Sequence, residues 1–457
     1  MRKLRIIAAI FICKLTRLAL RVAGRGGTAL PGLLAVKICP DILKYLAKDV
    51  RCIAVTGTNG KTTSARMLEQ FFIDSGAGCI TNKSGSNLLR GIAAEFALDA
   101  TATGKPKRKH AVIECDEAAS KQVFAHLDPQ ALLVTNVFSD QTDRFTDVGV
   151  TLENIKTAVK NAPNAVVCLN ADDSLTSSIA LDVPNKVVFY GVDKEIYENR
   201  ADEKSDAPRC IRCGTDYDYA YITYGHLGGF RCPACGYARK SPDIAVTEIL
   251  AQDADSQTIR VNAFGDEFDV TINIPGAYNI YNAAGAIASA MAAGFSKEAV
   301  KTAMRGFERG FGRMEKMVIN GIPLRMILVK NAAGCNQALN YLGSLTGDAL
   351  FAICLNDHIA DGTDISWIRD ANFEKLPDMN VDLQGVFVSG TRAQDIAQRL
   401  EAAGVPAGLL RVFTAPGDLL SAALEQNAPV YIMPTYTAML ELRGIISRKY
   451  GLKDYWE

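Results

Sequence analysis

The segment of this chain with the clearest chemistry follows a short apolar run and combines two glycines with a Lys-Thr pair, Thr56-Gly57-Thr58-Asn59-Gly60-Lys61-Thr62-Thr63. Because glycine has no side chain, it lets backbone N–H groups approach phosphate oxygens closely. In loops of this type the lysine reaches the β- and γ-phosphates, and the following hydroxyl binds Mg²⁺. The segment therefore predicts an ATP-binding loop made by Gly57, Thr58, Asn59, Gly60, Lys61, Thr62 and Thr63.

A cluster of acidic residues ends the next apolar run, in the sequence Ile113-Glu114-Cys115-Asp116-Glu117. Magnesium requires hard oxygen ligands, and the ligand sites of open α/β sheets collect at the carboxyl ends of strands. We therefore expect Glu114 to bind Mg²⁺ together with Thr62, with Asp116 or Glu117 as substitutes. The alternative is an acidic turn that merely faces solvent. Asn136 and the polar run 140–144 are expected to line the same cleft.

Two later segments offer side chains that could reach a bound nucleotide. Asn279 and Asn282 open a helix rich in small residues, and an amide such as that of Asn282 could bond an adenine edge. Asn at a helix start is also a common cap, which is the alternative. Arg313 could reach ATP when two domains close, or it could hold an interdomain salt bridge.

Four cysteines form two Cys-x-x-Cys pairs, Cys210 with Cys213 and Cys232 with Cys235, at the separation typical of a zinc ribbon. Four thiolates would close a tetrahedral Zn²⁺ shell and leave no open position, so the metal would be structural. The alternative is a set of unrelated buried cysteines. The surrounding residues are tyrosine-rich and mixed in charge, which argues against nucleic-acid binding.

The composition is that of an ordinary soluble protein, with 48% apolar and 22% charged residues. Lys+Arg and Asp+Glu balance at 50 each, so no overall charge attracts nucleic acid or a membrane. Most other cysteines lie in apolar runs, where a free thiol behaves as a small hydrophobic group. This usage fits a reducing cytoplasm better than a disulfide framework.

Residues 1–48 predict an amphipathic helical segment. Apolar residues recur there at helical spacing with basic residues between them: Leu4, Ile7, Ala8, Phe11, Leu15, Leu18 and Val22. The apolar run is too short to span a bilayer and lacks the cleavage site of a signal peptide. Two interpretations stay open, a helix packed on the protein or a helix on an anionic membrane surface. The second would place the protein peripherally at the inner face of the cell membrane.

Alternating apolar and helical segments predict an α/β fold with two sheets. We expect a central ATP-binding domain with a parallel sheet over 49–315, carrying the zinc ribbon as an insertion at 205–240, and a Rossmann-like domain over 316–457. The stretch 243–274 predicts a hairpin that turns at Phe264-Gly265-Asp266. The expected strands are 52–55, 111–114, 131–137, 165–169 and 186–190, then 324–329, 349–355, 385–389, 410–413 and 429–433.

Together the motifs resemble the Mur ligase family, in which the loop variant Gly-Thr-Asn-Gly-Lys-Thr occurs. Gly57 to Thr62, Glu114, the Asn279/Asn282 helix and Gly312-Arg313 stand in the family's order, and the resemblance covers residues 50–457. It implies a ligase that uses ATP and Mg²⁺ to phosphorylate a carboxylate. Lys61 would then act in the phosphoryl transfer.

Two features resemble one branch of the family: the short stretch before the ATP loop, where other members have a UDP-binding domain, and the four-cysteine insertion. The segment Leu355 to Trp367 also resembles that branch. The resemblance implies amidation of the α-carboxylate of D-Glu in lipid II to D-isoglutamine through an acyl phosphate. Ammonia would come from a GatD-type glutaminase subunit, as a heterodimer, and no glutaminase nucleophile is evident in this chain.

The same resemblance makes Asp364 the catalytic aspartate, either near the ammonia acceptor or orienting the partner's catalytic histidine. From the residues alone, Asp357, Asp361 and Asp364 all follow a predicted strand, and a capped turn is the alternative. Asn331 and Asn336 are expected as ribose or phosphate contacts. The alternative function is an amino-acid or folylpolyglutamate-type ligase that works without a glutaminase; a non-catalytic nucleotide-binding scaffold is a third.

Overall fold

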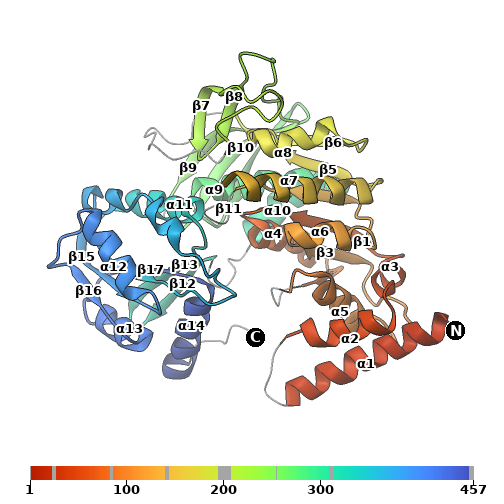
Figure 1. The fold of residues 1–457 in the computed structure, drawn as a ribbon, viewed down its shortest axis with the longest axis horizontal. Coiled ribbons are helices and arrows are strands. Elements are labelled where there is room, and N and C mark those ends of the chain that lie inside the picture. The colour runs from red at the N-terminus through yellow and green to blue at the C-terminus, as the bar shows by residue number, and fades with distance from the viewer. Residues whose placement is uncertain are drawn as a thin grey trace.

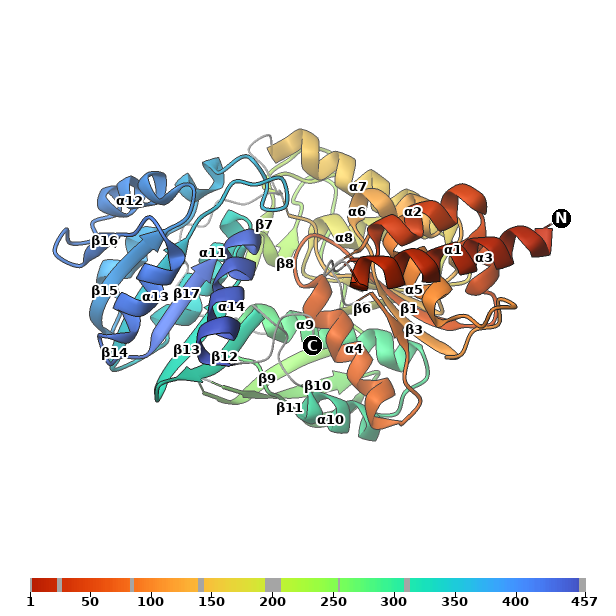
Figure 2. The ribbon, with the colours of Figure 1, turned by 90° about the horizontal axis from the view of Figure 1, so that it is seen from below.

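We analysed a computed structural model of the chain. It describes residues 2–22, 27–82, 86–138, 144–193, 207–253, 255–307 and 313–451, with side chains left out at 144–147 and 313. Three parts succeed one another along the molecule (Figure 1): N-terminal helices, a large central domain and a C-terminal domain. Figure 2 shows the N-terminal helices and the C-terminal domain on opposite sides of the central domain.

The central domain is built on a nine-stranded sheet of order β11-β10-β9-β6-β5-β4-β1-β3-β2. Every neighbouring pair from β2 to β9 is parallel, and β10 and β11 complete the sheet as antiparallel strands. The strands are β1 (Arg51–Thr56), β2 (Ile80–Thr81), β3 (His110–Glu114), β4 (Ala131–Val134), β5 (Val166–Asn170), β6 (Val187–Val192), β9 (Ile244–Gln252), β10 (Gln257–Ala263) and β11 (Asp266–Ile272).

Both faces of this sheet are covered, which explains why its parallel strands are largely apolar. Side chains alternate along β1, so Ile53 and Val55 join one core layer while Cys52 and Ala54 join the other. The first layer contains α4 (Lys61–Asp74), α9 (Ala277–Ala292) and α10 (Lys297–Gly306). The second contains α5 (Leu89–Asp99), α6 (Glu117–Val123), α7 (Arg144–Asn161) and α8 (Ser174–Ser178), which η1 (Ile179–Leu181) follows.

The N-terminal helices pack on that second layer and contribute to its core. They are α1 (Arg2–Val22), α2 (Ala29–Ile38) and α3 (Ile42–Leu46). α2 can approach α5 closely because it carries Gly32, where a Cβ would lie 1.6 Å from the Arg90 carbonyl oxygen. In the described part of the chain, no helix is long and apolar enough to cross a membrane.

The four-cysteine insertion stands between β6 and β9 and forms a separate antiparallel hairpin, at the top of Figure 1. Its strands are β7 (Asp218–Tyr224) and β8 (Leu227–Arg231). A small core of its own, Cys210, Tyr217, Phe230, Cys232 and Tyr237, holds the hairpin to the cysteine loops.

The C-terminal domain has a mixed six-stranded sheet of order β12-β13-β17-β14-β15-β16, in which β12 and β13 are antiparallel and the other pairs parallel. Its strands are β12 (Arg313–Ile319), β13 (Ile322–Ile327), β14 (Asp348–Cys354), β15 (Asp382–Ser389), β16 (Leu410–Val412) and β17 (Val430–Pro434). One face packs on α13 (Pro416–Leu424) and α14 (Tyr436–Tyr450). The other packs on α11 (Ala332–Gly343), η2 (Ser366–Arg369), η3 (Phe373–Asp378) and α12 (Ala393–Ala402).

The expected fold class is confirmed: a parallel-sheet central domain, a four-cysteine insertion and a C-terminal α/β sheet. Two expectations about strands need correction. The stretch 243–274 forms three strands rather than a hairpin, although the turn at Phe264 and Gly265 lies where expected. The strand expected over 131–137 ends at Val134, because the next residues leave the sheet to contact the ATP loop.

Candidate active site

The predicted ATP loop joins β1 to the N-terminus of α4, as the sequence indicates. Gly60 has a φ of 85°, and a Cβ there would lie 1.9 Å from the Oδ1 atom of Asn282. Asn282 comes from α9 and donates from its Nδ2 to Asn279 Oδ1 at 3.0 Å, while Ser64 Oγ donates to the Asn282 carbonyl at 3.2 Å. The Asn279/Asn282 helix therefore supports the loop directly and restricts position 60 to glycine.

The loop after β4 holds the ATP loop from the other side. Asn136 accepts from the Asn59 backbone N–H at 2.9 Å and donates to the Asn59 carbonyl at 3.1 Å. The Thr58 hydroxyl donates to the Phe138 carbonyl at 3.2 Å and accepts from the Phe138 N–H at 3.1 Å. Asn136 was expected to line the cleft, but its side chain instead fixes the backbone that forms it.

Lys61 is turned toward the backbone of the loop. Its Nζ donates to the Gly57 carbonyl at 2.5 Å, to the Thr58 carbonyl at 3.0 Å and to Glu117 Oε1 at 2.8 Å. Burial raises the pKa of Glu117 above the ordinary carboxyl value, and the Lys61 ammonium opposes that shift. Glu117 is thus the counterion of the predicted phosphate-binding lysine.

The three acids after β3 have separate surroundings. The backbone of Glu114 is fixed by Asn82, whose amide accepts from its N–H at 3.0 Å and donates to its carbonyl at 2.7 Å. The Asp116 carboxylate caps α6 by accepting from Ala118 N and Ala119 N. Because Asp116 caps a helix and Glu117 pairs with Lys61, Glu114 remains the best candidate for the Mg²⁺ ligand.

A cavity of about 490 Å³ connects this loop with the C-terminal domain, within the usual size range of ligand pockets. Thr58 to Thr63, Glu114 and Asp116, Asn279 and Asn282 line it from the central domain, and Gly57 does not. Lys330, Asn331, Gln337, Asp361 and Tyr436 are among the residues that line it from the C-terminal domain. The predicted nucleotide residues and the C-terminal domain thus face one space.

The C-terminal side of the cavity is tied to the ATP loop by an amide pair. Asn331 Nδ2 donates to Asn59 Oδ1 at 3.3 Å, while Asn331 Oδ1 caps α11 by accepting from Gly334 N at 2.8 Å. Asn336 does not line the cavity; its Oδ1 accepts from the Asn372 N–H at 2.7 Å. Its buried neighbour Gln337 does, and both polar atoms of that amide lack a hydrogen-bond partner among the described residues. A ligand could satisfy them, and the sequence pattern did not single out Gln337.

The three aspartates of the segment after β14 also have different contacts. Asp357 binds Thr391 and Arg392, which hold the pKa of its carboxyl below the usual value. Asp361 lines the cavity and accepts from the Thr437 N–H at 2.7 Å and from its hydroxyl at 2.5 Å, at the start of α14. Asp364 is half-buried outside the cavity lining, and its Oδ1 accepts from the Ser366 N–H at 2.8 Å.

Two predicted site segments remain outside the description. The side chain of Arg313 is not described, although its backbone pairs with Ile327 at the start of β12 and the next residue, Met314, lines the cavity. Of the polar run 140–144, residues 140–143 lie outside the described residues, and the side chain of Arg144 is not described.

The four cysteines meet as their spacing predicts. All four Sγ atoms lie within 4.8 Å of one another, with Cys210 and Cys235 3.6 Å apart and Cys213 and Cys232 3.4 Å apart. A tetrahedral ion with metal–sulfur bonds of ~2.3 Å separates its sulfurs by about 3.8 Å, so the set fits such an ion. A hydrogen bond with the Thr215 hydroxyl is the main cause that lowers the pKa of Cys213 to about 6.

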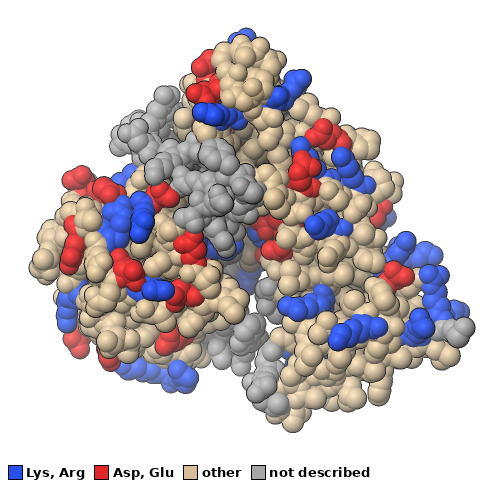
Figure 3. Space-filling view, in the orientation of Figure 1, with Lys and Arg blue, Asp and Glu red and all other residues tan. Residues whose placement is uncertain are grey.

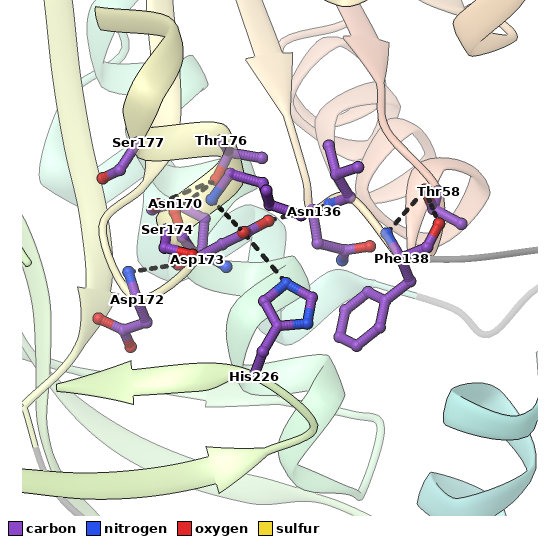
Figure 4. A network of polar contacts seen from close by, with 12 residues as sticks. Thr58, Asn136, Phe138, Asn170, Asp172, Asp173, Ser174, Thr176, Ser177 and His226 are labelled. Atoms are coloured by element: carbon purple, nitrogen blue, oxygen red, sulfur yellow. Dashed lines mark hydrogen bonds and ion pairs between the residues drawn. The ribbon is translucent and has the colours of Figure 1, made fainter. Parts of the chain in front are cut away.

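The hairpin between the two cysteine pairs reaches the ATP loop through buried polar groups (Figure 4). His226, between β7 and β8, contacts Asp173 Oδ1 through Nε2 at 3.1 Å, and Asp173 Oδ2 accepts from the Val137 N–H at 2.9 Å. The His226 ring also contacts the ring of Phe138, which exchanges hydrogen bonds with Thr58. The insertion therefore supports the segment that holds the ATP loop.

A buried ion pair lies beside the contact between His226 and Asp173. Asp172 accepts from Arg239 Nε at 2.6 Å, from Tyr281 Oη at 2.6 Å and from the Val192 N–H at 2.9 Å. Burial raises the pKa of Asp172, and the Arg239 guanidinium opposes this rise. Since Arg239 follows the hairpin and Tyr281 lies on α9, this pair fixes the insertion to the helix behind Gly60.

Comparison with solved structures defines the class of this fold. Over 92% of the chain it matches MurF from Acinetobacter baumannii with a TM-score of 0.68 at 15% identity, covering 80% of that structure. A pseudomurein peptide ligase type C from Methanothermus fervidus matches 90% of the chain and 80% of its own length, with a TM-score of 0.66 at 20% identity. The fold is that of the Mur ligases.

Sequence comparison gives the family more closely. Residues 55–216 match the Mur ligase middle domain, and residues 328–439 match the MurT ligase C-terminal domain. The lipid II isoglutaminyl synthase (glutamine-hydrolyzing) subunit MurT of Streptococcus pneumoniae is 33% identical over 93% of both chains. That of Staphylococcus aureus strain COL is 31% identical over 97% of this chain and 98% of its own. The chain therefore belongs to the MurT family of Mur ligases, which confirms the resemblance and the ligase class, and its middle domain implies ATP.

Replacing Gly60 by alanine tests the geometry of the ATP loop. The added Cβ would overlap Asn282 Oδ1 and the backbone would be strained at positive φ, so we expect ATP affinity to fall at least ~10-fold by isothermal titration calorimetry. Gly76→Ala, at the opposite end of α4, is the matched control, because its φ is 66° and a Cβ there meets nothing within 4 Å. Wild-type ATP affinity in Gly60→Ala would contradict this account.

Proposed function

We propose that the protein amidates the α-carboxylate of D-Glu in lipid II to D-isoglutamine, using ATP and ammonia from a GatD-type glutaminase subunit with which it forms a heterodimer. The observation that carries the proposal is the cavity that the ATP loop shares with the MurT-type C-terminal domain. The Streptococcus and Staphylococcus relatives are named as subunits of a glutamine-hydrolyzing lipid II isoglutaminyl synthase, which supports the substrate and the partner.

The chemistry requires activation because a carboxylate is a poor electrophile. ATP with Mg²⁺ supplies a transferable phosphoryl group, and its transfer to a carboxylate oxygen gives an acyl phosphate and ADP. Ammonia then attacks the acyl carbon and forms a carbon–nitrogen bond. The bond between the acyl carbon and the phosphate oxygen breaks, phosphate leaves, and the nitrogen loses a proton to give the amide. Groups that neutralise the negative charge on the phosphoryl oxygens accelerate such a transfer.

The residues around the cavity fit these roles. Gly57 to Thr63 would hold the phosphates, with Lys61 exchanging Glu117 for a phosphate oxygen, and Thr62 and Glu114 would bind Mg²⁺. Asn282 and Arg313 would contact the nucleotide. Gln337, whose buried amide lacks a described partner, would bind the acceptor or the nucleotide from the C-terminal side.

Reconstitution tests the proposed reaction. The chain is mixed with a cognate glutaminase, glutamine, ATP and lipid II, and mass spectrometry is used to find the conversion of one carboxyl to an amide. We expect conversion that depends on ATP and on either the glutaminase or added ammonium chloride. Ligation of an amino acid by the chain alone would instead establish the alternative ligase, and no ATP turnover in the full mixture would favour a nucleotide-binding scaffold.

Asp364 is proposed as the catalytic aspartate. Asp364→Asn should leave ATP binding intact and lower amidation at least ~100-fold, the scale on which misplaced catalytic groups slow a reaction. Asp357→Asn is the matched control, because that carboxylate in the same segment is already paired with Thr391 and Arg392. If ammonium chloride restores the rate of Asp364→Asn, the aspartate acts through the glutaminase. Near-wild-type turnover with glutamine would remove Asp364 from the site.

We also propose that the four-cysteine cluster holds a structural Zn²⁺ ion. Purified protein should contain about one zinc per chain, and Cys213→Ser combined with Cys235→Ser should lose it and lower the melting temperature, because the insertion's small core would no longer be closed. Elemental analysis and thermal unfolding measure both effects. Cys79→Ser, outside the cluster, is the control and should keep the metal. Zinc retained by the double variant would contradict the proposal.

A further inference from the structure

Helix α1 has two different apolar faces. Ala9, Ile10 and Cys13 are buried in the core that α1 shares with α2 and α5. The orientation is fixed further by polar contacts, since Lys14 Nζ donates to the Ala100 carbonyl and an Arg17 guanidinium nitrogen donates to the Gly27 carbonyl at 2.8 Å. One face of α1 is thus fully occupied by the protein.

The opposite face exposes a row of large apolar side chains, called here the α1 stripe: Leu4 70%, Ile7 42%, Phe11 65%, Leu15 54%, Leu18 59% and Val22 83% exposed. Their spacing of three or four residues places them in one line along the helix. The helical spacing of apolar residues in the sequence identifies these side chains. They do not pack on the protein body, because the buried residues of α1 are a different set. This surface spans the whole length of α1.

The charged residues of the N-terminal segment have one sign. Residues 1–40 contain no Asp or Glu, and their Lys and Arg residues are Arg2, Lys3, Arg5, Lys14, Arg17, Arg21, Arg25 and Lys37. On α1, Arg2, Lys3, Arg5 and Arg21 are exposed. Figure 3 shows an uncharged surface at the lower right, where Figure 1 places α1, with basic residues along its border. Because the whole chain has 50 Lys and Arg residues and 50 Asp and Glu residues, the part of the chain after residue 40 has a net negative charge.

We propose that the α1 stripe docks in the plane of an anionic membrane. A helix with an apolar face and a basic border inserts that face into the boundary between headgroups and acyl chains, while the basic residues contact anionic headgroups. A protein partner would need an acidic rim around a long apolar groove, whereas an anionic bilayer provides both features at once. The helix lies along the surface rather than across it, since its other face is packed on α2 and α5.

This docking surface does not depend on the proposed amidation, although it would suit a lipid-linked substrate. α1 packs on α5, and Asn87, just before α5, lines the cavity. A membrane-bound α1 would therefore keep the mouth of the site close to the bilayer. Vesicle binding can be measured without nucleotide or lipid II, so the two proposals fail separately.

Flotation with vesicles tests the surface. The full-length protein should bind phosphatidylcholine vesicles containing phosphatidylglycerol, bind pure phosphatidylcholine more weakly, and lose part of its binding in high salt, because salt screens the basic border. Phe11→Ser combined with Leu18→Ser should lower the vesicle partition coefficient at least ~10-fold, since it removes the apolar contact with the bilayer. Lys3→Glu with Arg21→Glu should reduce binding to the anionic vesicles alone.

Val150→Ser combined with Leu181→Ser is the matched control, because these side chains are 55% and 52% exposed on another part of the protein. It should bind vesicles like the wild type. Circular dichroism and the melting temperature establish that each variant is folded. Unchanged binding by Phe11→Ser/Leu18→Ser would overturn the proposal. A second result would also overturn it: the wild type is a dimer that does not bind vesicles, and the Phe11→Ser/Leu18→Ser variant is a monomer. The stripe would then be the interface between two copies of the chain.

Discussion

The position of the ATP loop is the constraint on which the rest of this structure depends. A phosphate-binding loop presents its backbone N–H groups to the ligand, so contacts with neighbouring elements must hold its conformation. Three asparagines from separate elements hold the loop, namely Asn136 after β4, Asn282 in α9 and Asn331 before α11. Because Asn331 belongs to the C-terminal domain, the same contacts that hold the loop also set the distance between the two walls of the cavity.

The four-cysteine insertion belongs to this arrangement although it lies far from the nucleotide loop in sequence. Asp172 and Asp173 are both buried, and a buried carboxylate is costly unless it is paired and hydrogen-bonded. Asp173 pairs with His226 and Asp172 pairs with Arg239. His226 precedes the second pair of cysteines in the sequence, and Arg239 follows it. The insertion is thereby fixed to the segment after β4 and to α9, the two neighbours of the ATP loop in the central domain. Closure of the insertion by a metal would stabilise this arrangement.

The sequence was sufficient for most strands of the two large sheets, for the loop at 56–63 and for the four-cysteine cluster. Buried parallel strands are continuous apolar runs, so most strand positions were predicted to within a few residues. The loop 56–63 and the four cysteines are local patterns. Three contacts join segments that are distant in sequence, and no periodic pattern predicts them: His226–Asp173, Lys61–Glu117 and Asn136–Asn59. For this reason the sequence alone predicts Asn136 as a cleft residue. Periodicity also cannot tell which face of α1 packs, because either face is apolar.

The ion pair between Lys61 and Glu117 shows how the loop can keep its shape without a nucleotide. Three acceptors already surround the ammonium, so the lysine needs no phosphate to stay in the loop. A phosphate that takes over Lys61 leaves Glu117 buried without its counterion, and burial then favours the protonated carboxyl. The buried acid can thus lose its partner without retaining an unpaired charge. The loop can therefore be preformed in the free protein and still give up its internal salt bridge when the nucleotide arrives.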